Sequence, residues 1–169
     1  MGLTSSIISI ITCGLIAGIF FAFSIAINPA FSKLDDLAYI KAMQHINESI
    51  QNLLFLACFL LPCFLLPVSA WLNFKQGAIA AAWLFTIAAL LYIIGVFGLT
   101  IAVNVPLNNQ LATLTIHGEQ LSIVRHQFSG KWNLAHTWRT ALSIVVFIIN
   151  ILALCAMFKG TPAGVIKTA

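Results

Sequence analysis

Four stretches of the chain are almost entirely apolar, and the segments between them hold most of the polar residues. The apolar stretches cover residues 5–28, 52–73, 78–103 and 139–158. Each reaches the length of roughly 20 residues that an α-helix needs to cross the hydrocarbon core of a bilayer. Because lipid offers no partner to a free backbone amide or carbonyl, a segment that crosses it must be helical. The pattern therefore predicts four transmembrane helices.

The connection between the first and second stretches predicts an amphipathic helix. Its apolar residues recur every three or four positions, which places them on one helix face. They are Leu37, Ile40, Met43, Ile46 and Ile50. The opposite face carries Lys41, Gln44, His45 and Glu48. Such a helix is expected to lie on the end of the bundle.

The connection over residues 104–138 repeats this pattern twice. Leu107, Leu111 and Leu114 form one stripe, which Gly118 ends. A further helix is predicted from Leu121 to Phe128, before Gly130. An even number of spans separates the two long connections, so both lie on the same side of the membrane. We predict an all-α fold: an integral membrane four-helix bundle, with amphipathic helices in the two long loops capping one end. It forms a single transmembrane domain over residues 1–169.

Composition narrows the class of protein. The chain is 61% hydrophobic and 7% charged, against about 25% charged residues in an average soluble domain. This excludes a soluble enzyme domain and leaves no room for a separate extramembrane domain. The net charge of +4 is spread along the chain without a basic run. It therefore favours membrane lipids as partners and no nucleic acid. We expect the protein in the cell (inner) membrane.

Polar residues at the predicted membrane surface form the candidate site. If the last helix begins soon after Gly130, Trp132, His136 and Arg139 lie at positions i, i+4 and i+7 and share one face. Asn104 and Asn108 are also four residues apart, at the end of the third span. Amides buried at that depth need hydrogen-bond partners. These residues define a pocket at the end of the bundle as the default site.

The first amphipathic helix would roof this pocket with Met43, Gln44 and Asn47. Each residue also has a structural interpretation. Arg139 can be an anchor at a helix end, whose charge reaches the membrane surface, and Trp132 can be an ordinary interfacial tryptophan. Only the convergence of several such residues favours a functional site over these interpretations.

Four segments also resemble a known family. The chain is similar to the anthrone oxygenase-like family of membrane proteins over Phe21–Ala30, Met43–Asn47, Gly95–Thr100 together with Asn104–Asn108, and Trp132–Thr140. The specific parts are the Asn-Val-Pro-Leu-Asn element at residues 104–108 and the Arg-Thr pair at residues 139–140. The family's last motif runs Trp, three residues, Asn or His, two residues, Arg-Thr, and His136 occupies its variable position. Ala135 stands where members often carry a second Trp.

The resemblance implies a membrane-embedded oxygenase that acts with O₂ on a lipophilic aromatic substrate, anthrone-like or quinol-like. Fungal members of the family oxidise an anthrone to an anthraquinone. This chemistry requires no cofactor in principle, but it needs a base and hydrogen-bond donors for the developing oxyanion. The expected roles are His136 as base, Arg139 and the two asparagines as oxyanion donors, and Trp132 as the stacking surface. The roof residues Met43, Gln44 and Asn47 would contact the substrate.

Two other functions remain open from the residues alone. The first is a redox protein that binds haem b or copper, with His136, His45 and Met43 as candidate ligands. The second is a non-catalytic structural bundle, which could form a homo-oligomer through the small residues Gly14 and Gly18.

Overall fold

The structure, a computed structural model, describes residues 2–114 and 120–159. It is all-α over these residues. Four helices in it are long and apolar enough to cross a membrane: Gly2–Phe31, Leu53–Lys75, Ile79–Ala112 and Leu121–Phe158. The predicted fold class and its four candidate spans are therefore confirmed. Gly118 lies outside the described residues.

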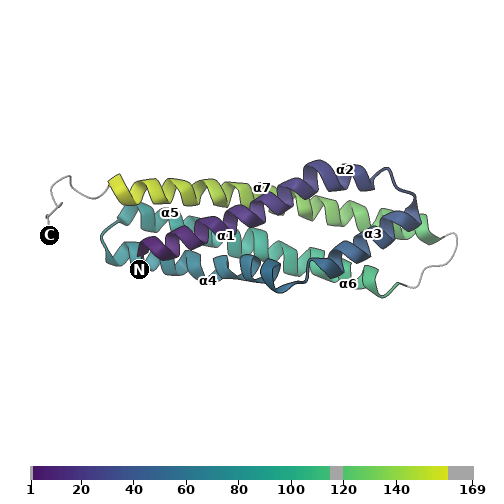
Figure 1. Cartoon of the computed structure of the whole chain (residues 1–169), viewed down its shortest axis with the longest axis horizontal. Helices are drawn as coiled ribbons and strands as arrows, with labels where there is room; N and C mark the ends of the chain where they lie inside the picture. The colour runs from purple at the N-terminus through teal and green to yellow at the C-terminus, as the bar shows by residue number, and fades with distance from the viewer. Residues whose placement is uncertain (1, 115–119, 160–169) are drawn as a thin grey trace.

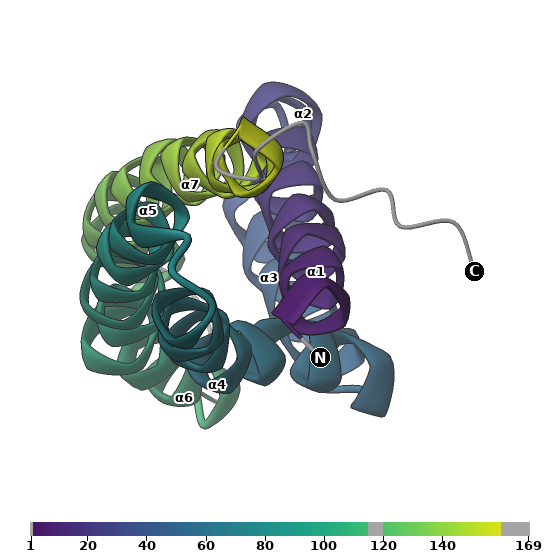
Figure 2. The same ribbon diagram turned by 90° about the vertical axis from the view of Figure 1, so that its left-hand side faces the viewer.

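The four long helices run along one axis and alternate in direction (Figure 1). Helix α1 (Gly2–Ala22) packs on α4 (Leu53–Lys75), α4 on α5 (Ile79–Leu90), and α7 (Leu121–Lys159) on both α5 and α1. The end view in Figure 2 shows them arranged around a common centre. The α4–α5 turn lies at one end, where Gly77 has a φ of +77° that glycine adopts without strain. The opposite end holds α2 (Asn28–Phe31), α3 (Asp36–Ser49) and α6 (Val105–Ala112).

Two of the long helices contain π-helical segments just before a proline. The segment η1 (Phe23–Ile27) joins α1 to α2, whose first turn contains Pro29. The segments η2 (Leu91–Gly98) and η3 (Thr100–Asn104) join α5 to α6, whose first turn contains Pro106. A proline ring clashes with the carbonyl four residues earlier, which lies in η1 for Pro29 and in η3 for Pro106, and a widened π turn relieves that clash. The segment η2 ends eight residues before Pro106, so this clash does not account for it. Such turns also change the direction of nearby side chains and are frequent at functional sites.

Helix α3 covers the bundle end as predicted. The side chain of Asp35 caps it by accepting a hydrogen bond from the backbone N–H of Ala38 at 2.8 Å. Ile40 and Met43 of the predicted stripe are buried, and the ring of Tyr39 is buried beside them. Burial raises the pKa of the Tyr39 phenol, although the nearby charge of Arg125 opposes this effect. The α3 helix therefore packs on α6 and α7 through its apolar face.

The second long connection is shorter than predicted. Its first stripe belongs to α6, which continues the third span without a break as far as Ala112. The predicted separate helix ending before Gly130 is wrong, because α7 runs through Gly130 from Leu121 to Lys159. A glycine inside a helix costs only about 1 kcal/mol, and burial of Phe128 and Trp132 on the same face outweighs it. At 1.5 Å per residue α7 is about 58 Å long, so part of it extends beyond the hydrocarbon layer of about 30 Å.

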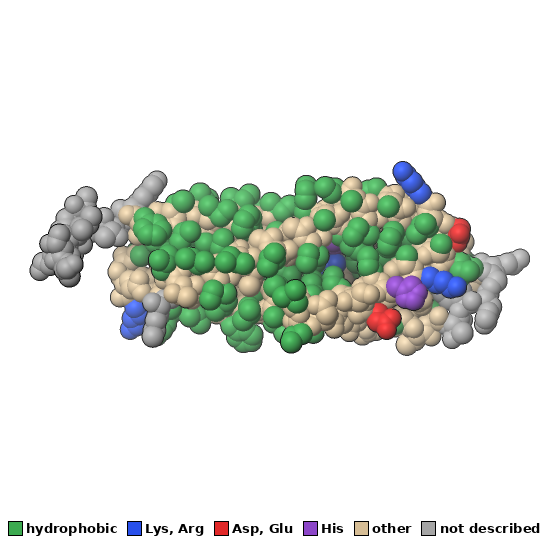
Figure 3. Space-filling model, in the orientation of Figure 1, with side chains coloured by type: hydrophobic (Ala, Val, Ile, Leu, Met, Phe, Trp, Pro, Cys, Tyr) green, Lys and Arg blue, Asp and Glu red, His purple; other side chains and the backbone are tan. Residues whose placement is uncertain are grey.

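The outer surface of the bundle is suited to lipid. Large apolar side chains cover its middle, while the Lys, Arg, Asp and Glu side chains on the face shown in Figure 3 gather mainly at the two ends. Trp71 and Trp83 are exposed beside the α4–α5 turn, and Trp138 is exposed toward the other end. Trp132, by contrast, is only 2% exposed, so the interpretation of this residue as an interfacial tryptophan is wrong.

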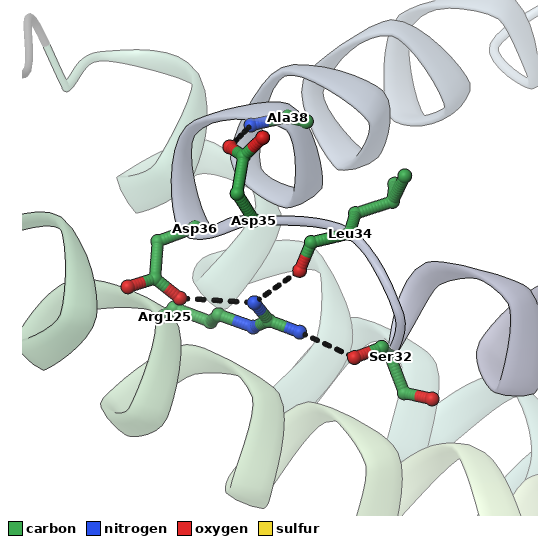
Figure 4. Close-up of polar contacts among 6 residues, drawn as sticks. All are labelled: Ser32, Leu34, Asp35, Asp36, Ala38 and Arg125. Atoms are coloured by element: carbon green, nitrogen blue, oxygen red, sulfur yellow. Dashed lines mark hydrogen bonds and ion pairs between the residues drawn. The ribbon is translucent and has the colours of Figure 1, made fainter.

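Arg125 of α7 holds the segment that leads into α3 (Figure 4). Its Nη1 donates to the carbonyl of Leu34 at 2.7 Å and to Oδ1 of Asp36 at 2.9 Å. Its Nη2 donates to the carbonyl of Ser32 at 3.1 Å. The guanidinium also lies 4.6 Å from the ring centre of Tyr39. Arg125 thus ties the N-terminal end of α3 to α7.

Replacing Arg125 by Gln is expected to loosen α3. Hydrogen bonds to a charged group contribute about 1.5–3 kcal/mol each, and the partial exposure of this side chain reduces that value. We expect backbone amides of residues 36–49 to exchange with deuterium about tenfold faster or more. The exposed neighbour variant His126→Gln should exchange like the wild type. Equal exchange in the two variants would show that Arg125 does not restrain α3.

Candidate functional site

The structure buries one face of α7 where it meets α1, α3 and the end of the third span. Trp132, His136 and Arg139 are 2%, 1% and 8% exposed. They lie one turn apart on the same side of the helix, as their spacing predicts. Phe20 and Phe23 of the first span pack on His136, with ring centres 5.8 Å and 5.1 Å away. The site is therefore an aromatic enclosure inside the bundle.

The hydrogen bond between Arg139 and His136 determines the state of the imidazole. Nε of Arg139 donates to Nδ1 of His136 at 3.1 Å. A guanidinium can only donate, so Nδ1 must carry a lone pair. A neutral imidazole with a bare Nδ1 carries its proton on Nε2, and Nε2 lies 3.0 Å from the hydroxyl of Ser24. His136 thus donates to Ser24 and accepts from Arg139.

Hydroxyl groups complete this network. Sequence reasoning named Thr140 only as part of the family's Arg-Thr pair and missed Ser24 and Thr100. Ser24 lies in η1 and also contacts the hydroxyl of Thr140 at 3.2 Å, which in turn donates to the carbonyl of His136 at 2.7 Å. Nη1 of Arg139 donates to the hydroxyl of Thr100 in η3 at 3.3 Å. Ser24 and Thr100 are polar residues inside apolar spans, within segments that resemble the family. A polar residue in an apolar span, within a segment that resembles the family, was therefore the sequence feature that could have identified them.

Aromatic rings enclose the guanidinium. The central carbon of Arg139 lies 4.3 Å from the ring centre of Phe20 and 5.2 Å from that of Trp132. Trp132 also stacks on His136, with ring centres 4.9 Å apart and planes at 17°. Cation–π contacts of this kind contribute about 0.5–2 kcal/mol. Among the described residues, no Asp or Glu side chain forms a salt bridge with Arg139.

Asn104 and Asn108 both bind Trp132 rather than each other. Oδ1 of Asn108 accepts from the indole Nε1 at 2.8 Å, which fixes the plane of the ring that stacks on His136. Nδ2 of Asn104 donates to the carbonyl of Trp132 at 3.3 Å. Asn104 is fully buried, and its Oδ1 has no hydrogen-bond partner among the described residues.

The three residues of α3 that the sequence predicts as substrate contacts have different surroundings. Met43 is fully buried in an apolar cluster with Phe23 and Trp132. Gln44 donates to the carbonyl of Leu111 in α6 at 2.8 Å, so its amide binds the neighbouring helix. Asn47 is 7% exposed, and its Nδ2 has no partner in the described part of the chain. Asn47 and Asn108 line a groove of about 730 Å³ between α3 and α6.

Of the alternative ligands, His45 lies at the exposed surface, whereas Met43 and His136 are buried. His45 is exposed on the rim of the α3–α6 groove, whereas Met43 is inside the apolar cluster. Both ring nitrogens of His136 are engaged by Arg139 and Ser24. Within residues 2–114 and 120–159, no three His, Cys, Asp or Glu side chains are grouped as a metal site would require.

A hollow gives access to the interior from the side of the bundle. In Figure 3 it lies between the C-terminal part of the first span and α3, where Lys or Arg atoms and His atoms are visible at its floor. Apolar side chains surround it on the flank of the molecule.

Comparison with known proteins adds one finding. A family model described as anthrone oxygenase matches residues 43–149, which include the C-terminal half of α3, the third span and the site face of α7. No curated protein and no solved structure matches the chain.

The hydrogen-bond directions predict a single tautomer for His136, protonated at Nε2. A long-range ¹H–¹⁵N correlation spectrum of histidine-labelled protein should show this pattern for the signal that disappears in His136→Asn. His126→Asn, at an exposed position of α7, identifies a control signal. A proton on Nδ1 of His136 would contradict the assigned network.

Proposed function

Since the chain belongs to the anthrone oxygenase family, we propose that it is a membrane enzyme that uses O₂ to oxidise a lipophilic aromatic substrate. The substrate class is anthrone-like or quinol-like, and the reaction requires no cofactor. One observation carries the proposal: a buried Arg139 bonded to His136 inside an aromatic enclosure. This arrangement suits a flat aromatic molecule that becomes an anion as it reacts.

For an anthrone-like substrate, the proposed oxidation proceeds through a carbanion and a peroxide. The substrate methylene between two aromatic rings loses a proton, and the resulting carbanion is delocalised onto the ring oxygen as an oxyanion. The anion passes one electron to O₂, and the radical and superoxide combine into a peroxide at that carbon. Loss of water then forms the new carbonyl. The sum is R₂CH₂ + O₂ → R₂C=O + H₂O, with O₂ as the oxidant.

Arg139 would stabilise the oxyanion. Positioned donors in a site that excludes water stabilise developing charge far better than they do in solution. The guanidinium would move from Nδ1 of His136 to the ring oxygen of the bound substrate before that oxygen becomes negatively charged. The lone pair of Nδ1 is thereby released and can accept the substrate proton, so that His136 serves as the base.

The asparagines would have separate roles. The unpaired Oδ1 of Asn104 can accept a hydrogen bond from a ring hydroxyl of the substrate. Asn108 acts on the indole of Trp132, and Trp132 provides the stacking surface, so Asn108 is a positioning residue. Asn47 would contact the polar edge of a substrate from the α3–α6 groove, which Asn47 and Asn108 both line, and Met43 and Gln44 would form the walls.

The substrate would reach this site through the membrane. A polycyclic aromatic molecule partitions into the bilayer, and the lateral hollow offers it a route. We place the enzyme in the cell membrane, where such substrates and O₂ are both concentrated.

The activity test uses purified protein in lipid nanodiscs, an anthrone and an oxygen electrode, with empty nanodiscs as the measure of spontaneous oxidation. The wild type should consume O₂ and release one anthraquinone for each O₂. His136→Ala should lower turnover by about 10² to 10⁴, the usual contribution of a positioned base. Thr137→Ala, exposed on the same turn of α7, should retain wild-type turnover.

Two results would contradict the proposal. One is a wild type that does not exceed the empty nanodiscs. The other is a stoichiometric haem or copper signal, seen in the absorption spectrum and in metal analysis, that disappears in His136→Ala together with the activity. The second result would establish the redox protein instead.

A further inference from the structure

The positive charge of Arg139 has no negatively charged partner among the described residues. An arginine side chain stays protonated in proteins, and its burial without a counter-ion is costly in a membrane. The salt bridge that the described residues form joins Arg125 to Asp36. The groups around Arg139 are a neutral imidazole, a hydroxyl and two aromatic rings. The site is therefore electrostatically incomplete without an anion.

The free donors of Arg139 indicate what kind of anion fits. Of its five N–H groups, one binds His136 and one binds Thr100. This leaves three, all on the two terminal nitrogens, without a described partner. Two parallel N–H groups on one edge of a guanidinium match the two oxygens of a carboxylate. A carboxylate is thus the complementary group.

The surroundings indicate what the carboxylate is attached to. The hollow that leads inward opens among apolar side chains on the lipid-facing flank of the bundle. Phe21 and Ile25, on the first span close to Ser24, are 48% and 60% exposed. A ligand that extends from Arg139 through this opening would have its body in the hydrocarbon layer. Its remainder must therefore be apolar.

We propose that the site binds the carboxylate of a single-chain fatty acid taken from the bilayer. The carboxylate lies on the terminal N–H groups of Arg139, and the acyl chain extends through the lateral opening into the lipid. Fatty acids then compete with an oxyanion for the same guanidinium and act as inhibitors of the proposed oxidation. Binding itself does not depend on that reaction and can be measured without O₂.

The test compares laurate with dodecanol, which has the same chain length and no charge. Wild-type protein in a neutral detergent is titrated with each, and thermal unfolding is followed together with equilibrium binding of radiolabelled laurate. Laurate should raise the unfolding temperature more than dodecanol does. In Arg139→Gln the two ligands should become equivalent, with laurate affinity at least tenfold lower.

Lys131→Gln is the matched control, because it removes an exposed positive charge from the same helix. It should keep the preference for laurate. If Arg139→Gln does not fold, Arg139→Lys serves in its place and should bind laurate more weakly, since an ammonium lacks the paired donors. Equal effects of laurate and dodecanol on the wild type, or full affinity in the folded Arg139 variant, would overturn the proposal.

Discussion

A guanidinium inside a membrane bundle is the feature on which the rest of this structure depends. Arg139 is held by neutral partners: the Nδ1 lone pair of His136, the hydroxyl of Thr100 and the rings of Phe20 and Trp132. Such contacts offset part of the cost of removing a charge from water but do not neutralise it. An ionisable residue inside a membrane bundle commonly marks a functional site. Both proposed roles of the site, as an oxyanion holder and a carboxylate receptor, follow from this one charge.

The fold places these partners through irregular helix geometry. Ser24 and Thr100 both come from π-helical segments that precede Pro29 and Pro106. A regular α-helix would turn the same side chains in other directions. Helix α3 then covers the enclosure, and Arg125 ties its N-terminal end to α7. The apolar middle of the bundle supplies the helices, whereas the local departures from regularity build the site.

The sequence predicted the four spans, the amphipathic α3 and the shared face of Trp132, His136 and Arg139, because these follow from hydrophobic spacing. It did not predict that α7 continues through Gly130, since the packing of Phe128 and Trp132 outweighs the low helix propensity of glycine. It also missed Ser24 and Thr100. Their contacts depend on where π turns occur, and those turns leave no periodic pattern in a uniformly apolar run.

The most direct test of an uncompensated charge on Arg139 is to give that side chain a counter-ion. In Thr100→Asp a carboxylate replaces the hydroxyl that lies 3.3 Å from Nη1 of Arg139, while Thr100→Asn is the uncharged control. If Arg139 is an uncompensated cation kept for an anion, the Asp variant should unfold at a higher temperature than the Asn variant and lose laurate binding. An Asp variant that is less stable than the Asn variant and still binds laurate would contradict this account.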